Sequence, residues 1–425
     1  MAEMMDSHNQ LHWHFHILSI RESDFPCIGR GTANMRFLIH GFYGAGNAGD
    51  DALLHAIIEQ ILVRCPEAQI DVIVRSKTLI PYFGSHPVGT VSGFDLNMIH
   101  HAVASCDILI VGGGGLFQDY SGFSVLQLFQ GSQAGLSRQG AINYYSAPMF
   151  MAKTLGKKIF LYGLGIGPFH SREAERATAW ICGLADAVTV RDYGSYALLT
   201  ELGVNGVTLT GDPALWMGDV LDGPLVKSDK QERPPGKELV IGLNLREWTY
   251  GQEEGKRVRQ ALIQTSSKLA EEHGAKLRIY TFNRSKREEQ LAESIADELP
   301  VGSVEIVHYT DASPLDMKRQ FAELDLMIAM RLHACILSLT TGTPAIGLSY
   351  DPKVTQLYEE LQLTELCMPI QHVATEGLYG LAMSILGDRA GWKSRISENL
   401  APLRLRETKN GEILSKLMGQ KGEES

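Results

Sequence analysis

Two side chains that could take part in catalysis, Arg331 and His333, follow the apolar residues 328–330. The apolar run predicts a buried strand, and the pattern after His333 predicts a helix that begins there. A guanidinium binds phosphate or carboxylate through a fork of N–H donors, an imidazole titrates near neutral pH, and the amino end of a helix attracts anions. This pair therefore predicts a binding site for a small anionic substrate with a titratable group beside it.

Two further cations stand at comparable places in the same half of the chain. Arg246 ends the apolar run 239–245, and Lys353 follows the run 345–349 at the start of another predicted helix. A highly charged anion needs fixed cations in a protein whose net charge is −10. We therefore expect Arg246 and Lys353 to help bind the anion. For Arg331 the alternative is an ion pair with a helix carboxylate.

The first half of the chain carries carboxylates where the second half carries cations. A predicted strand at 36–40 leads into a glycine-rich segment at 41–51, and apolar residues at helical spacing follow it. Asn47 or Asp50 can cap that helix. The segment lacks the Lys-Ser/Thr of a P-loop and is not a clean dinucleotide fingerprint. Since Asp50 and Asp51 would repel a phosphate at the helix start, we predict that the segment binds hydroxyl groups.

Other predicted strands of this half also end in glycines or carboxylates, in segments 112–119, 163–168, 191–192 and 211–215. Ligands of open α/β sheets bind beyond the carboxyl ends of the strands, so one shared cleft explains these segments better than unrelated turns. Asp119 and Asp212 are candidates to contact an acceptor hydroxyl, Gly114 to let a ligand approach the backbone, and Tyr43 to stack on a sugar. The alternatives are helix capping, turn formation and core packing.

The alternation of strands and helices predicts two Rossmann-like domains. Residues 35–220 and 239–377 each contain this alternation, and the stretch 221–238, rich in Pro, Gly and charge, is the expected linker. We expect residues 378–425 to form helices that pack back on the first domain, and residues 1–34 to be a disordered leader or an over-extended start. The predicted fold is α/β and resembles the GT-B arrangement, with the active site in the interdomain cleft.

Composition argues against several classes of protein. The net charge of −10 argues against a general nucleic-acid binder. The longest apolar runs fall short of the ~20 residues that a membrane-spanning helix needs. The six cysteines form no C-x-x-C pair, which favours buried thiols in a reducing cytoplasm over disulfides or zinc ligands. No cluster of His, Cys and Asp has the spacing of a metal site, so we expect no metal and no cofactor.

The motifs, in their order along the chain, resemble those of polysaccharide pyruvyl transferases of the CsaB type. The resemblance covers about residues 35–370, and it rests on agreement in order because each motif is weak by itself. The segments that carry it are 41–50, 112–119, 163–168, 190–192, 211–215, 244–246 and 331–333 with 349–353.

The resemblance implies a metal-free, GT-B-like enzyme. It would transfer the enolpyruvyl group of phosphoenolpyruvate to two hydroxyls of a sugar in a cell-wall or exopolysaccharide precursor, giving a cyclic pyruvate ketal and phosphate. Arg331, His333 and Arg246 would serve the donor, with His333 as the general acid. Asp50 and Asp212 are our choices for the acceptor side. A lipid-linked acceptor would bring the enzyme to the inner face of the cell membrane, and the oligomeric state, including a homo-oligomer, stays open.

Two other functions compete with this one. A GT-B glycosyltransferase with a nucleotide-sugar donor would account for the domains and the cleft, but it would leave Arg331 and His333 with a smaller role in the reaction. A non-catalytic homologue, or an NAD-binding protein built on the segment 41–51, is the other alternative. Asp50 and Asp51 weaken the NAD version because their charges would stand beside the pyrophosphate.

Overall fold

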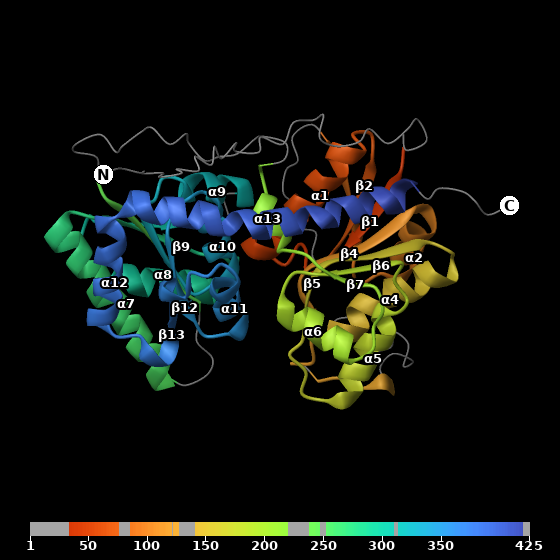
Figure 1. Cartoon of the computed structure of the whole chain (residues 1–425), viewed down its shortest axis with the longest axis horizontal. Helices are drawn as coiled ribbons and strands as arrows, with labels where there is room; N and C mark the ends of the chain where they lie inside the picture. Colours follow the sequence, from red (N-terminus) through yellow and green to blue (C-terminus); the bar gives the residue numbers. More distant parts are fainter. Residues whose placement is uncertain are drawn as a thin grey trace, which may run out of the picture.

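A computed structural model describes residues 34–75, 86–120, 122–126, 141–219, 238–246, 252–309 and 313–419. The predicted leader lies outside these residues except for Asn34, and so does the predicted linker except for Glu238. Within the described residues each half of the chain forms a parallel sheet flanked by helices (Figure 1). The predicted α/β fold with two Rossmann-like domains is confirmed.

The first sheet has seven parallel strands in the order β3-β2-β1-β4-β5-β6-β7. Its central strands are continuously apolar because helices cover both faces of the sheet. Its strands are β1 (Arg36–His40), β2 (Gln69–Val74), β3 (Val88–Ser92), β4 (Ile108–Phe117), β5 (Lys158–Ile166), β6 (Ala187–Val190) and β7 (Val207–Leu209). Its helices are α1 (Ala48–Arg64), α2 (Leu96–Ser105), α4 (Ala141–Thr154), α5 (Arg172–Cys182) and α6 (Tyr193–Glu201), and the short η3 (Pro213–Trp216) follows β7.

The second sheet has six parallel strands in the order β10-β9-β8-β11-β12-β13. Its strands are β8 (Val240–Asn244), β9 (Lys276–Tyr280), β10 (Val304–Val307), β11 (Leu326–Ala329), β12 (Ala345–Ser349) and β13 (Cys367–Pro369). Its helices are α7 (Gln252–His273), α8 (Lys286–Ala296), α9 (Pro314–Phe321), α10 (Leu332–Thr340), α11 (Pro352–Glu360), α12 (Thr375–Gly387) and α13 (Arg389–Gly419). The 3-10 turns η4 (Thr364–Leu366) and η5 (Ile370–His372) flank β13.

Helix α1 lies between the two domains. Leu54 and Ile57 on one face belong to the core of the first sheet, whereas Ala48 and Ala52 pack with the core of the second domain. A helix buried on opposite faces shows little amphipathic pattern, and α1 accordingly has apolar or small residues around most of its circumference. Its amino end therefore stands at the junction of the domains.

Helix α13 runs along both domains (Figure 1). Its first half packs Trp392 and Ile396 into the core of the second domain, and its last turns pack Leu414 and Leu417 into the core of the first. A buried ion cluster lies midway, where Asp219 pairs with Lys318 of α9 and with Arg404 of α13, each at 2.7 Å. Because removing one partner would strand a buried charge, this cluster ties both domains to α13.

The five described cysteines are free thiols. Four of them are buried, as the sequence predicts. None of the helices in the described ranges combines the length and apolar character needed to cross a membrane.

Candidate active site

The amino ends of α1 and α10 meet across the domain boundary. Asn47 caps α1 by accepting hydrogen bonds from the backbone N–H groups of Gly49 and Asp50, and Arg331 occupies the cap position of α10. Gly49 touches the imidazole of His333, so a Cβ at position 49 would overlap with Nδ1 of that ring. A glycine is therefore required where the amino end of α1 meets the ring of His333. Converging helix amino ends favour negative charge, which suits an anionic ligand.

His333 faces Asp212, which caps η3 at the end of the first sheet. The distance from His333 Nε2 to Asp212 Oδ2 is 3.6 Å, and Nε2 makes no hydrogen bond with any described residue. Asp212 also accepts hydrogen bonds from Arg191 Nη1 at 2.8 Å and from the backbone N–H of Ala214 at 3.0 Å. Burial alone would raise the pKa of Asp212, but Arg191 and His333 hold this pKa at about 2. A permanent carboxylate therefore stands beside an imidazole whose buried Nε2 has no hydrogen bond among the described residues.

Asp50 lies in the first turn of α1, against the glycines of β4. A Cβ on Gly114 would come within 3.1 Å of Asp50 Oδ1, and the φ of +84° at Gly114 also favours glycine. Burial and the neighbouring Asp51 raise the pKa of Asp50 to about 7, although Arg191, Lys353 and Arg331 act in the opposite direction. Its side chain keeps some contact with solvent. A carboxylate with a pKa near 7 can act as a general base at neutral pH.

Asp51 joins the domains through side-chain contacts. Its Oδ2 accepts a hydrogen bond of 2.6 Å from the hydroxyl of Tyr309. The guanidinium carbon of Arg284 lies over the Tyr309 ring, 5.1 Å from the ring centre. The backbone pairs at the same place, because Ala48 N–H donates to Phe282 O and Arg284 N–H donates to Gly46 O. These contacts fix the glycine-rich segment of the first domain against the second domain.

Arg331 forms an ion pair with Glu288 of α8. Arg331 Nη2 donates to Glu288 Oε2, while Glu288 Oε1 accepts from the backbone N–H of Phe282 at 2.6 Å. Both side chains are largely buried. The Nε of Arg331 has no partner among the described residues. The pairing with a helix carboxylate that the sequence left as an alternative is therefore present, and it leaves a buried N–H donor of the guanidinium without a partner among the described residues.

Arg246 and Lys353 stand on the second-domain side of the same region. Arg246 Nη1 donates to the hydroxyl of Tyr350 at 2.7 Å, and the guanidinium lies 4.9 Å from the centre of that ring. Lys353 Nζ is 3.1 Å from Asp351 Oδ2 and remains substantially exposed. A small pocket between the domains brings Lys353 together with Arg191 and Asp212.

Two sequence candidates have structural roles. The ring of Tyr43 is fully buried, and its hydroxyl donates to Gly112 O, so no face of the ring is free to stack on a sugar. This burial corrects our expectation for Tyr43. The buried Asp119 accepts hydrogen bonds from the backbone N–H groups of His170 and Ser171 at 2.8–2.9 Å, which anchors the segment after β5. A contact between Asp119 and an acceptor stays a prediction.

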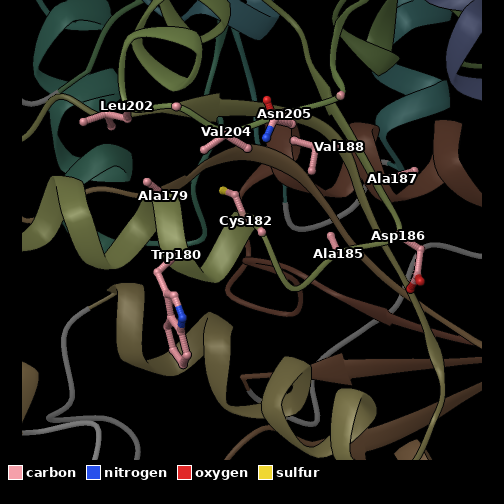
Figure 2. Close-up of a pocket in the computed structure, with 13 residues that line it drawn as sticks. Ala179, Trp180, Cys182, Ala185, Asp186, Ala187, Val188, Leu202, Val204 and Asn205 are labelled. Carbon is pink, nitrogen blue, oxygen red and sulfur yellow. The ribbon is translucent and has the colours of Figure 1, made fainter.

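The structure also adds Arg191 and Glu288 to the region. Arg191 directly follows β6, and its position as a cation at the end of a strand could have identified it from the sequence. Glu288 lies 43 residues from Arg331 in sequence and had no local signal. A separate pocket at the amino end of β6, lined by Cys182, Asp186 and Val204, is shown in Figure 2. It lies at the opposite edge of the sheet from the carboxyl ends, and we do not include it in the site.

A family model described as "Polysaccharide pyruvyl transferase" matches residues 47–352, nearly three quarters of the sequence. The chain belongs to the polysaccharide pyruvyl transferase family. The resemblance seen in the sequence is thereby confirmed, and the family implies a pyruvyl donor and a saccharide acceptor. The matched range contains Asp50, Asp212, Arg331 and His333, while Tyr43 and Lys353 fall just outside it.

Comparisons with individual proteins place this pyruvyl transferase among distant relatives. The amylovoran biosynthesis protein AmsJ of Erwinia amylovora is 21% identical over 375 residues, which cover 79% of this chain and 88% of AmsJ. The UDP-GlcNAc 2-epimerase of Methanocaldococcus jannaschii has a TM-score of 0.55 at 10% identity, covering 90% of this chain and 99% of the epimerase. That of Neisseria meningitidis has a TM-score of 0.53 at 10% identity, covering 91% and 99%. At such identities the epimerases show the shared GT-B-like fold alone.

Proposed function

We propose that this protein transfers the enolpyruvyl group of phosphoenolpyruvate to two hydroxyls of one sugar, forming a cyclic pyruvate ketal and releasing phosphate. The observation that carries the proposal is the contact of His333 with Asp212 across the domain boundary, with Asp50 next in sequence to Gly49, which lies against the His333 ring. It combines an imidazole, a carboxylate with a pKa of about 7 and a permanently ionised carboxylate. Family membership supplies the class of reaction.

The second domain is the proposed donor side. Phosphoenolpyruvate carries a phosphate and a carboxylate on one small molecule, and it needs several cations at short range. Arg331 contributes a guanidinium whose buried Nε has no partner among the described residues, Arg246 contributes a guanidinium packed on an aromatic ring, and Lys353 contributes an exposed ammonium. The amino ends of α10 and α11 add partial positive charge to the same region.

The proposed reaction has two additions to the same carbon. His333 gives a proton to the methylene carbon C3, and a sugar hydroxyl adds to C2 as its proton passes to Asp50. The C2–O bond to phosphate then breaks, which releases phosphate and leaves an oxocarbenium ion at C2. The second hydroxyl adds to that carbon and loses its proton. Of the two hydroxyl protons, one balances the proton gained by C3 and the other leaves with phosphate.

The first domain is the proposed acceptor side, where Asn47, Asp50 and Gly114 surround the amino end of α1. Membership of the polysaccharide pyruvyl transferase family supports a saccharide acceptor, and we propose that the acceptor is an exopolysaccharide or cell-wall precursor. We place the reaction in the cytoplasm, at the inner face of the membrane when the acceptor is lipid-linked.

The pH dependence of the reaction tests the role of Asp50. A general base with a pKa of about 7 must be deprotonated, so kcat/KM for the acceptor should rise through pH 7 and level off above it. Asp50→Asn should remove this rise of kcat/KM with pH, together with most of the activity. An unchanged rise of kcat/KM through pH 7 in the variant would contradict the role of Asp50 as general base.

Protein stability gives an independent check on the same pKa. Because folding raises the pKa of Asp50 above its unfolded value, the folded state binds more protons between these two values. The free energy of unfolding therefore falls as pH rises towards 7, and the cost persists above it. Asp50→Asn removes this cost, so its melting temperature relative to wild type should be higher at pH 8 than at pH 4.

Product analysis separates the proposal from a glycosyltransferase. The purified protein is incubated with a synthetic disaccharide acceptor and either phosphoenolpyruvate or UDP-sugars, and released phosphate and UDP are measured. We expect acceptor-dependent release of phosphate from phosphoenolpyruvate. Release of UDP without release of phosphate would refute the pyruvyl transfer.

A further inference from the structure

An arginine surrounded by aromatic rings follows the carboxyl end of a strand in the first sheet, outside the site described above. Arg75 directly follows β2, and its guanidinium carbon lies 5.2 Å from the ring centre of Phe42, 5.6 Å from that of Phe94 and 5.0 Å from that of Tyr144. We refer to these four residues as the Arg75 cage. Cation–π contacts of this kind hold a guanidinium in place while leaving N–H donors at its edge.

No carboxylate in the described part of the chain neutralises the charge of Arg75. Among the described residues no carboxylate forms an ion pair with Arg75, in contrast to Arg191, Arg331 and Arg404, each of which pairs with Asp or Glu. The adjacent His40 is buried, and burial lowers its pKa to about 4, so it adds no second charge. Arg246 is likewise supported by a ring, that of Tyr350, and is a proposed anion ligand. An arginine packed on aromatic rings in the first domain therefore indicates a second anion-binding group.

The cage adjoins the proposed acceptor side. Phe42 belongs to the segment between β1 and α1 that leads to Asp50, and the backbone N–H of Arg75 donates to Tyr43 O at 3.0 Å. Tyr145 lies near both places. Burial and the charge of Asp50 raise the pKa of its hydroxyl, whereas the charge of Arg75 and a hydrogen bond with Arg75 act in the opposite direction. The cage also keeps an open side, since Phe94 is 44% exposed and Phe42 and Arg75 are partly exposed.

We propose that the Arg75 cage is an acceptor subsite that binds an anionic group of the saccharide, next to the sugar whose hydroxyls react at Asp50. Phe42 and Phe94 would lie against an apolar sugar face while the guanidinium holds a phosphate or a carboxylate. The anion belongs either to a sugar diphosphate, as in a lipid-linked precursor, or to a uronic acid. The assignment to the acceptor rests on the proposed function, whereas binding of the anion can be measured without turnover.

Calorimetric titrations of the full chain test this subsite. The probes are UDP-N-acetylglucosamine for the diphosphate, glucuronic acid for the carboxylate, N-acetylglucosamine as the neutral sugar and phosphoenolpyruvate as the donor. The proteins are wild type, Arg75→Gln and the control Arg176→Gln, which removes an exposed guanidinium from α5 in the same domain. Melting curves establish that each variant is folded. Should Arg75→Gln fail to fold, Arg75→Lys replaces it, because lysine keeps the positive charge over the rings but lacks the forked N–H donors of the guanidinium.

We expect one anionic sugar to bind wild type more tightly than the neutral sugar, and Arg75→Gln to weaken this binding about tenfold or more. Arg75→Lys should weaken it several-fold, and Arg176→Gln should leave it unchanged. The probe that loses affinity identifies the diphosphate or the carboxylate as the bound group. Failure of both anionic sugars to bind wild type, or unchanged binding by Arg75→Gln, would overturn the proposal. An equal loss of phosphoenolpyruvate binding would also overturn it by assigning Arg75 to the donor.

Discussion

Replacing His333 with alanine is expected to lower kcat by roughly 10²–10⁴-fold, the usual contribution of a general acid. The imidazole Nε2 makes no hydrogen bond within the described residues, and its nearest charged partner is Asp212 Oδ2 at 3.6 Å. Binding of phosphoenolpyruvate should change much less than kcat, because the proposed donor cations stay in place. Steady-state kinetics gives kcat, and equilibrium dialysis of labelled phosphoenolpyruvate gives the affinity.

His372→Ala is the matched control for this variant, since His372 is an exposed histidine of the same domain. It should keep the activity of the wild type. A His333→Ala enzyme with normal kcat, or one that has lost donor affinity in proportion to its loss of kcat, would contradict the role of His333 as proton donor.

Arg331→Ala is expected to lower kcat/KM for phosphoenolpyruvate by about tenfold to a hundredfold, because a hydrogen bond to a charged group contributes about 1.5–3 kcal/mol. The same substitution strands the buried carboxylate of Glu288. Breaking a buried pair on one side typically costs about 3–5 kcal/mol of stability, so the single variant should also unfold more easily. Kinetics and thermal melting measure the two effects separately.

A double variant distinguishes donor binding from structural pairing. Glu288→Gln keeps an acceptor for the backbone N–H of Phe282 and removes the stranded charge, so Arg331→Ala with Glu288→Gln should recover stability. It should not recover donor use. Recovery of kcat/KM together with stability would show that Arg331 is only the partner of Glu288.

The sequence predicted the two α/β domains well because both sheets are parallel and buried, which leaves apolar runs separated by helices. It missed β3 and β13, which are short edge strands with weak apolar signals. The glycines at 112–115 were expected to end a strand. They lie inside β4 instead, since the sheet register shifts after Gly114 and the strand continues to Phe117.

The candidate site was predictable where a residue ends a strand or begins a helix. Arg331, His333, Asp212 and Asp50 all occupy such places, and the structure brings them together at the domain boundary. Tyr43 occupies a similar place, but its ring turns into the core under the glycines of β4. The direction in which a side chain points depends on packing that short sequence patterns do not encode.

Partners that are distant in sequence were beyond prediction. Glu288 reaches Arg331 from a different helix, and Tyr309 reaches Asp51 from the other domain. The pKa of Asp50 depends on the same assembly, because burial between the domains raises it while Arg191, Lys353 and Arg331 lower it. Only a folded arrangement of both halves defines these environments.

The most direct test of the central claim follows one carbon from donor to product. The enzyme is incubated with phosphoenolpyruvate labelled with ¹³C at C2 and a saccharide acceptor, and the product is examined by NMR while released phosphate is counted. We predict a labelled quaternary ketal carbon in the saccharide, bound to two sugar oxygens and a methyl group, with one phosphate released per ketal. Label that appears only in free pyruvate, or in an enol ether that keeps its methylene group, would contradict transfer to two hydroxyls.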